Sequence, residues 1–252
     1  MARMARVVPG RSAGRPADEP ARRIVSEFRS LSPYLPLCAI LDISLKEALR
    51  FFYFFGRGAR NMDFASCVKS HGGKAKSWGQ RFFVDRNPGI FDPQGVCASL
   101  VARWIKDTKL GVNFQKDMWT TYGVAEVEQL EVNKGKDSRE FVAKYLENAG
   151  LKRLNEYGFK GGLKFDHIVV TATQAAGYSF VGISSKGVEK SPKGHALGVH
   201  VPNKTGTPYL LFDPNFGQAE FTTVDPLKKL FKEMLCTVYS KYTGTALVER
   251  FI

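Results

Sequence analysis

The sequence changes its pattern near residue 165, and this change limits the folds that the chain can adopt. Before it, the predicted elements are helices; after it, short apolar runs alternate with turn residues, as strands do. The predicted strands cover residues 166–172, 178–183, 195–201, 209–212, 219–223 and 246–251, with one helix from Asp225 to about Leu235. Helices followed by an antiparallel sheet predict an α+β protein in two lobes.

Three helices are predicted before the sheet. Residues 44–47 resemble a capping box that opens a helix ending at Gly56, a second helix starts at Cys97, and a third spans residues 138–151. Residues 111–133 look irregular, and the glycines of residues 158–162 interrupt the pattern. These helices are expected to form the N-terminal lobe.

Residues 1–30 are predicted to be a disordered extension. The first 24 residues hold six arginines and almost no large apolar side chains, so they cannot bury enough surface to offset the entropy of ordering. The segment has no apolar core of the kind found in secretory signal peptides, and an export or targeting role is one interpretation of it. Residues 31–252 are then expected to form one domain.

The chain carries a formal net charge of +13, which predicts attraction to anionic partners. No nucleic-acid-binding motif is present, so we expect no nucleic acid partner. An anionic membrane surface is the alternative, because the aromatic residues 51–55 are followed by Arg57 and Arg60; packing of these aromatics in a core or interface is the competing interpretation. Charged residues interrupt residues 34–56 too densely for a membrane span.

The four cysteines are far apart in a chain too long to need disulfide bonds, and we expect free thiols in a reducing compartment. They are Cys38, Cys67, Cys97 and Cys236. Cys67 and His71 have a spacing that a zinc site uses, but no second pair of ligands lies near them in the sequence, so no metal or other cofactor is expected.

Cys97 differs from the other cysteines because a turn gives way to an amphipathic helix at this residue. Apolar residues follow it at the spacing of one helix face: Leu100, Val101, Trp104 and Ile105. The free N–H groups and the positive dipole end of a helix N-terminus favour a thiolate below the usual cysteine pKa of about 8.5. The alternative is a small buried apolar side chain.

A reactive thiol needs a base, and that base needs a group to orient it. His195 opens one predicted strand, Asp213 closes the next, and residues 202–207 between them form a hairpin turn. A turn centred near Lys204 and Thr205 places Asp213 opposite residues 195–197.

The other three histidines fit this role less well. His200 is at an odd offset from His195 and points to the other face of the sheet. His167 follows Asp166 directly, and neighbours in a strand point in opposite directions, while His71 lies in a surface stretch rich in Gly and Lys. Elimination leaves His195 as the base.

Three segments resemble the catalytic blocks of the YopT/AvrPphB family of bacterial effector cysteine proteases. They are residues 95–104 (GVCASLVARW), 194–199 (GHALGV) and 212–218 (FDPNFGQ). The resemblance, carried by residues 90–225, implies a papain-like domain over residues 31–252 in which the nucleophile helix packs on the antiparallel sheet. It implies Cys97 as nucleophile, His195 as general base and then acid, and Asp213 as the residue that orients the imidazole.

The resemblance also implies a virulence effector that a type III secretion system exports and that cleaves a host protein in the host cytosol or at a membrane surface. YopT-like members cleave prenylated GTPases with basic tails, a substrate that this basic chain does not suit. Gln94 or a backbone N–H near Cys97 would bind the oxyanion. The alternatives are a deamidase, transglutaminase or acyltransferase with the same triad, and a basic docking protein without catalysis.

Overall fold

The computed structural model describes residues 63–252, except residue 88 and residues 92–95, 137–139, 161–164 and 186–193. The predictions of a disordered extension over residues 1–30 and of a helix ending at Gly56 lie outside these residues.

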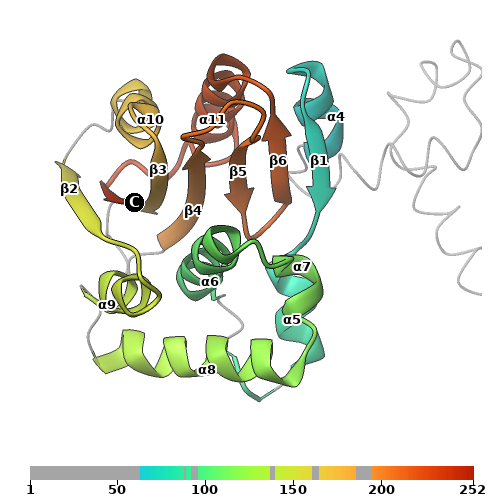
Figure 1. Ribbon diagram of the computed structural model, residues 1–252, viewed down its shortest axis with the longest axis vertical. Helices are drawn as coiled ribbons and strands as arrows, with labels where there is room; N and C mark the ends of the chain where they lie inside the picture. Colours follow the sequence, from blue (N-terminus) through green and yellow to red (C-terminus); the bar gives the residue numbers. More distant parts are fainter. Residues whose placement is uncertain (1–62, 88, 92–95, 137–139, 161–164, 186–193) are drawn as a thin grey trace, which may run out of the picture. The chain divides into compact units, whose positions relative to one another are not determined.

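One antiparallel sheet runs through the described part of the chain (Figure 1). Its order is β1-β6-β5-β4-β3-β7-β2, and every neighbouring pair is antiparallel. The strands are β1 (Lys74–Ser77), β2 (Arg153–Lys160), β3 (Gly177–Ser184), β4 (Gly194–Val201), β5 (Tyr209–Asp213), β6 (Gly217–Phe221) and β7 (Thr245–Phe251). Strand β4 is therefore central, with β5 on one side of it and β3 on the other.

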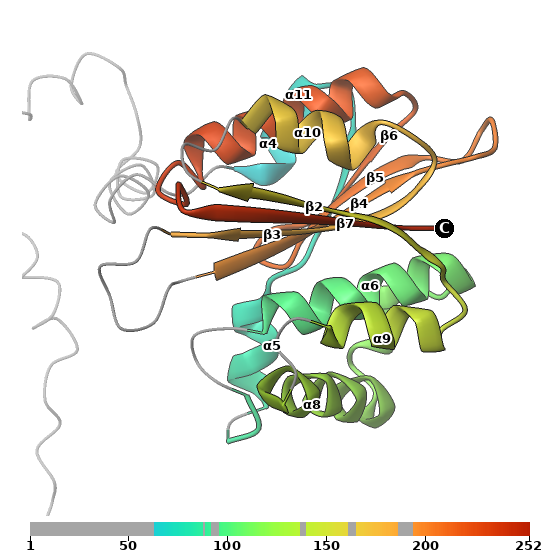
Figure 2. The same cartoon turned by 90° about the vertical axis from the view of Figure 1, so that its left-hand side faces the viewer.

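Helices cover both faces of this sheet (Figure 2). On one face lie α5 (Gln80–Arg86), α6 (Cys97–Leu110), α7 (Phe114–Asp117), α8 (Thr121–Lys136) and α9 (Phe141–Asn148). On the other face lie α4 (Phe64–Ser70), α10 (Phe165–Thr173) and α11 (Val224–Thr237). The predicted α+β class, with the helix of Cys97 packed on an antiparallel sheet, is confirmed; the second helical layer is an addition to it.

The alternation of side chains along the strands divides the interior into two cores. From β4 and β5, Leu197 and Leu211 enter the core under α10 and α11, whereas Ala196 and Phe212 enter the core under α6. Both faces of these strands are buried, so the strands are apolar along nearly their whole length.

Helix α6 begins at Cys97, as predicted, and lies unusually close to β4. The ring of Trp104 stacks on Phe212, with centroids 5.2 Å apart, and lies directly over Gly198. A Cβ atom at Gly198 would be 2.6 Å from Cε3 of Trp104, which is too short for a van der Waals contact. The glycine in the middle of β4 therefore permits the helix that carries Cys97 to pack on the strand that carries His195.

The prediction of a strand over residues 166–172 is wrong, because this segment forms α10. Its β-branched residues favour a strand locally, and a short apolar run cannot be assigned by periodicity alone. In the structure Ile168, Val169 and Ala172 are buried, while Val170 is 56% exposed, and this is the burial pattern of one helix face.

Residues 111–133, predicted to be irregular, contain α7 and most of α8. Two glycines, Gly123 and Gly135, weaken the helical pattern of α8, but Val127 and Leu130 are buried and anchor it. The predicted interruption at residues 158–162 is also wrong in part, because β2 runs through Gly158 to Lys160. Strand β1 was not predicted.

Candidate active site

The two sheet residues of the predicted site lie together where β4 begins and β5 ends. Nε2 of His195 donates a hydrogen bond to Oδ1 of Asp213 over 3.0 Å. Both side chains are buried, His195 at 5% exposure and Asp213 at 0%. A buried carboxylate bonded to a ring N–H holds the imidazole in one orientation and stabilises its protonated form.

The hairpin register brings about this meeting. Gly198 pairs with Phe212 and His200 with Leu210, so extending the ladder by one pair places Asp213 opposite residue 197. That position is within the predicted range of residues 195–197, at its far end. His195 is two residues along β4 from this position and therefore points to the same face of the sheet as its predicted partner.

Cys97 reaches the same place from the other layer, as the first residue of α6. Burial raises the pKa of the Cys97 thiol, but hydrogen bonds with His195 and with the backbone N–H of Ala196, together with the charge of His195, lower it below its usual value overall. Burial lowers the pKa of His195, but Asp213 and the interaction with Cys97 outweigh this effect and raise it to about 10. These opposite directions favour a thiolate paired with an imidazolium.

Tyr239, just after α11, was not predicted and contacts both His195 and Asp213. Its hydroxyl donates a hydrogen bond of 2.5 Å to Oδ2 of Asp213, and the hydroxyl oxygen lies 2.9 Å from Nε2 of His195. Its ring stacks on the imidazole with centroids 4.6 Å apart. Burial and the Asp213 charge raise the pKa of Tyr239 well above its usual value, so the hydroxyl stays a donor. No motif in the sequence marks this residue.

The turn after Asp213 completes the hydrogen bonding around the carboxylate. The backbone N–H of Asn215 donates to Oδ1 of Asp213 over 2.8 Å, and the Asn215 amide donates to the Tyr239 hydroxyl over 3.3 Å. The turn residues Pro214 and Asn215 are visible in the sequence, but their role in holding the carboxylate depends on the fold.

The predicted oxyanion donor Gln94 lies outside the described residues. A different glutamine, Gln80, accepts a hydrogen bond from the N–H of Val96 over 3.1 Å and donates one to Asn215 over 2.6 Å. It thereby connects the residue before Cys97 with the turn after Asp213. The first N–H groups of α6, which begin at Cys97, have no acceptor inside the helix.

The remaining histidines lie away from this cluster. His200 stacks on Tyr178 with centroids 4.7 Å apart, on the α6 side of the sheet, and burial lowers its pKa to about 4. His167 is on α10, and His71 follows α4 and contacts Glu233.

The three cysteines within the described residues, Cys67, Cys97 and Cys236, are free thiols, as predicted. None of the helices that the structure describes has the length and apolar character to cross a membrane.

The chain is similar to solved structures at low sequence identity. Among solved structures it is similar to the Pseudomonas avirulence protein AvrPphB (TM-score 0.44, 18% identity, covering 62% of this chain and 90% of that one). It is also similar to PatoxP, a cysteine protease-like domain of the Photorhabdus asymbiotica toxin PaTox (TM-score 0.43, 16% identity, covering 75% and 57%).

A third similar structure is a double glycine motif protease from an AMS/PCAT transporter, in complex with the leader peptide (TM-score 0.28, 15% identity, covering 71% and 94%). No curated protein matches the sequence. The Peptidase_C58 family, described as Yersinia/Haemophilus virulence surface antigen, matches residues 66–247. The chain therefore belongs to this family, the YopT/AvrPphB family of cysteine proteases that the three sequence blocks resembled.

Proposed function

We propose that the protein is a cysteine endopeptidase with Cys97 as nucleophile, His195 as general base and acid, and Asp213 as the residue that orients the imidazole. The observation that carries this proposal is the position of buried His195, which is bonded to Asp213 through Nε2 and interacts with Cys97 at the start of α6. Since Nε2 is engaged, Nδ1 is the nitrogen available to the sulfur. Membership of a peptidase family supports the same reaction.

In the first half of the reaction the Cys97 thiolate attacks the carbonyl carbon of the scissile peptide and forms a carbon–sulfur bond. The imidazolium of His195 then gives its proton to the leaving amine, and the carbon–nitrogen bond breaks. In the second half neutral His195 takes a proton from water, and the resulting hydroxide attacks the thioester. The acid is released, and the thiolate and imidazolium are restored.

The tetrahedral intermediates carry a negative oxygen that needs hydrogen-bond donors. The N–H of Cys97 itself, at the N-terminus of α6, supplies one donor in this proposal. Gln80 supports this donor indirectly, because it holds Val96 and Asn215 on the two sides of the site. Tyr239 acts as a positioning residue for the imidazole.

We further propose that the substrate is a protein of a host cell, to which the chain is exported as a type III effector. The family is one of virulence proteins, and this supports the proposal. The net charge of +13 suits work at an anionic membrane surface or on an acidic substrate region.

The test is a comparison of new protein N-termini in a eukaryotic lysate treated with wild-type protein or with Cys97→Ala. The proposal expects new N-termini only with the wild type. Mass changes without cleavage would contradict proteolysis and indicate a deamidase or a transferase. An unchanged proteome with a folded wild-type protein would leave binding as the function and contradict catalysis.

A further inference from the structure

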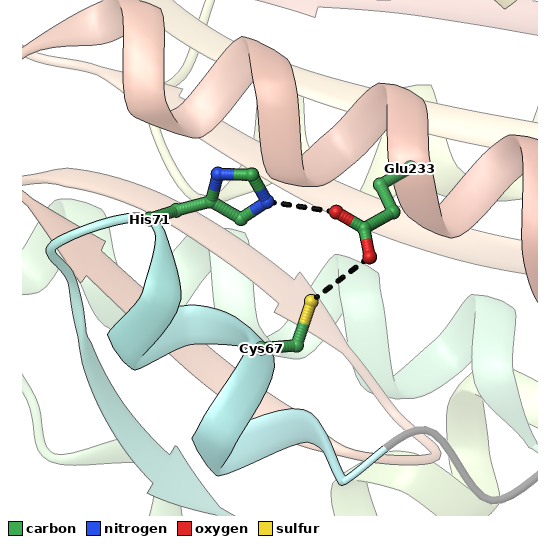
Figure 3. Close-up of side chains that lie close together, drawn as sticks. All are labelled: Cys67, His71 and Glu233. Atoms are coloured by element: carbon green, nitrogen blue, oxygen red, sulfur yellow. Dashed lines mark hydrogen bonds and ion pairs between the residues drawn. The ribbon is translucent and has the colours of Figure 1, made fainter.

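A second group of reactive side chains lies on the far side of the sheet from α6, where α4 packs near α11 (Figure 3). Cys67 and His71 come from α4 and the residue that caps it, four positions apart, and thus lie on one side of the helix. Glu233 comes from α11 and points toward both of them. The group shares no side chain with the proposed catalytic residues.

The donor atoms of the three residues converge. Sγ of Cys67 is 3.5 Å from Oε1 of Glu233, and Nε2 of His71 is 2.8 Å from Oε2 of the same carboxylate. One donor atom from each residue lies within 4.8 Å of the other two. Bonds of about 2.3 Å to sulfur and about 2.0 Å to nitrogen and oxygen, at tetrahedral angles, separate such donors by about 3.3–3.5 Å. Small side-chain movements therefore suffice to place all three around one ion.

The chemistry of the three donors selects the class of ion. A thiolate, an imidazole and a carboxylate together suit Zn²⁺ and similar first-row transition metals. Ca²⁺ and Mg²⁺ prefer oxygen ligands and bind thiolate sulfur poorly. Three protein ligands leave the fourth tetrahedral position for water. An ion and a water molecule can reach the three donors, because Cys67 and His71 are partly exposed and the Glu233 side chain is 43% exposed.

Both helices hold their donors in place. In α4, Phe64 and Val68 are buried and Asp63 caps the N-terminus, while the N–H of His71 bonds to the carbonyl of Cys67. In α11, Phe231 and Met234 on either side of Glu233 are fully buried. A site built on two anchored helices needs little reorganisation to bind its ion.

We propose that Cys67, His71 and Glu233 form a binding site for Zn²⁺ or a similar transition metal, with water as the fourth ligand, and that the ion ties α4 to α11. The site takes no part in the proposed peptide cleavage, because it shares no side chain with the proposed catalytic residues. The proposal therefore stands whether or not the proposed function is correct.

The test uses the full chain with Cys38, Cys97 and Cys236 replaced by serine, so that Cys67 is the one remaining thiol. Co²⁺ alone is the probe, because it reports a bound thiolate and tetrahedral geometry by its absorption spectrum, and Zn²⁺ is then added as competitor. The expected results are one bound ion per chain, thiolate and tetrahedral bands that Zn²⁺ abolishes, and a higher Tm with Zn²⁺.

Three variants in this background distinguish metal binding by all three side chains from binding by the Cys67 thiolate alone. Cys67→Ser removes the thiolate band. His71→Gln and Glu233→Gln should each weaken binding by more than about 100-fold, since loss of a group that only hydrogen-bonds to a metal ligand costs about 10–100-fold. Absence of the thiolate band in the background protein, or full affinity in either His71→Gln or Glu233→Gln, would overturn the proposal. Glu233→Gln keeps the thiol and the exposed position, and far-ultraviolet circular dichroism verifies that each variant is folded.

Discussion

Tyr239 stacks its ring on the imidazole of His195, with centroids 4.6 Å apart, and bonds through its hydroxyl to the carboxylate that His195 also binds. The ring restricts rotation of the imidazole, and the hydroxyl satisfies the carboxylate oxygen that His195 leaves open. A buried carboxylate whose two oxygens both have hydrogen-bond donors holds the imidazole in one orientation.

Tyr239→Phe keeps the stacked ring and removes the hydroxyl. We expect kcat to fall by about tenfold, equivalent to about 1.4 kcal/mol, with little change in KM, because the Tyr239 side chain is buried and acts through the imidazole. Active-site titration corrects for misfolded protein, and Tyr242→Phe, a change to the neighbouring ring, is the control. An unchanged kcat, or a loss explained entirely by fewer active sites, would mean that the hydroxyl has no positioning role.

The opposite pKa shifts of Cys97 and His195 predict a broad pH profile. The pair is active when Cys97 has lost its proton and His195 has kept one, so kcat/KM rises with pH through the lowered pKa of Cys97. It falls as pH passes the raised pKa of His195, near 10. Asp213→Asn removes the charge that raises the His195 pKa, and the falling limb should move to lower pH. The same falling limb in both proteins would contradict this assignment.

Gly198→Ala tests how α6 is positioned. The new Cβ would lie 2.6 Å from the Trp104 ring and 3.3 Å from Val101, so α6 must move away from β4. We expect a loss of about 1–3 kcal/mol in the free energy of unfolding, as in other overpacked cores, and a fall in kcat/KM of the folded fraction. Urea denaturation and kinetics measure the two effects. Gly182→Ala, on neighbouring β3 with an ordinary 3.6 Å contact to Phe180, should be tolerated; equal effects would refute the packing argument.

Arg103, on α6, is 2% exposed and contacts three carboxylates, those of Asp107, Asp117 and Glu126. Replacing it by Met keeps much of the volume but leaves the buried carboxyl of Asp107 without its cation, while Glu126 keeps only Lys106. The expected cost is about 3–5 kcal/mol in the free energy of unfolding.

The matched control is Arg81→Met on α5, where the side chain is 89% exposed and its ion pair with Asp85 is long, at 3.7 Å. Exposed pairs contribute little, so denaturation of this variant should resemble the wild type. A similar loss in both variants would show that the buried network is not what anchors α6.

The relation of His195 to Asp213 could be predicted because it depends on one short hairpin. The turn residues and the alternation along two adjacent strands determine the register to within one residue. The start of α6 at Cys97 could likewise be predicted from local sequence, since a run of apolar residues at helical spacing follows it. The three proposed catalytic residues were predicted from these local signals.

Tyr239, α8 and α10 depend on contacts between distant segments and were not predicted. Tyr239 is 44 residues from His195, and no spacing rule connects them. Helix α8 is held by tertiary contacts, including the bonds of Glu126 to Arg103 and Lys106, rather than by its own helical preference. Ile168 and its β-branched neighbours prefer a strand locally, but in α10 they pack against α11, and this packing outweighs the local preference.

We infer that Cys97 is a thiolate because His195 holds the proton. The most direct measurement is the rate at which iodoacetamide modifies each cysteine of the full chain at pH 6, with the modified peptides identified by mass spectrometry. Cys97 should react first, and Cys67, whose pKa burial and Glu233 raise to about 11, should be an internal control that reacts slowly. In folded His195→Ala the Cys97 rate should fall by more than about tenfold. Equal Cys97 rates in the two proteins, or a Cys97 no faster than Cys67 in the wild type, would contradict a thiolate–imidazolium pair.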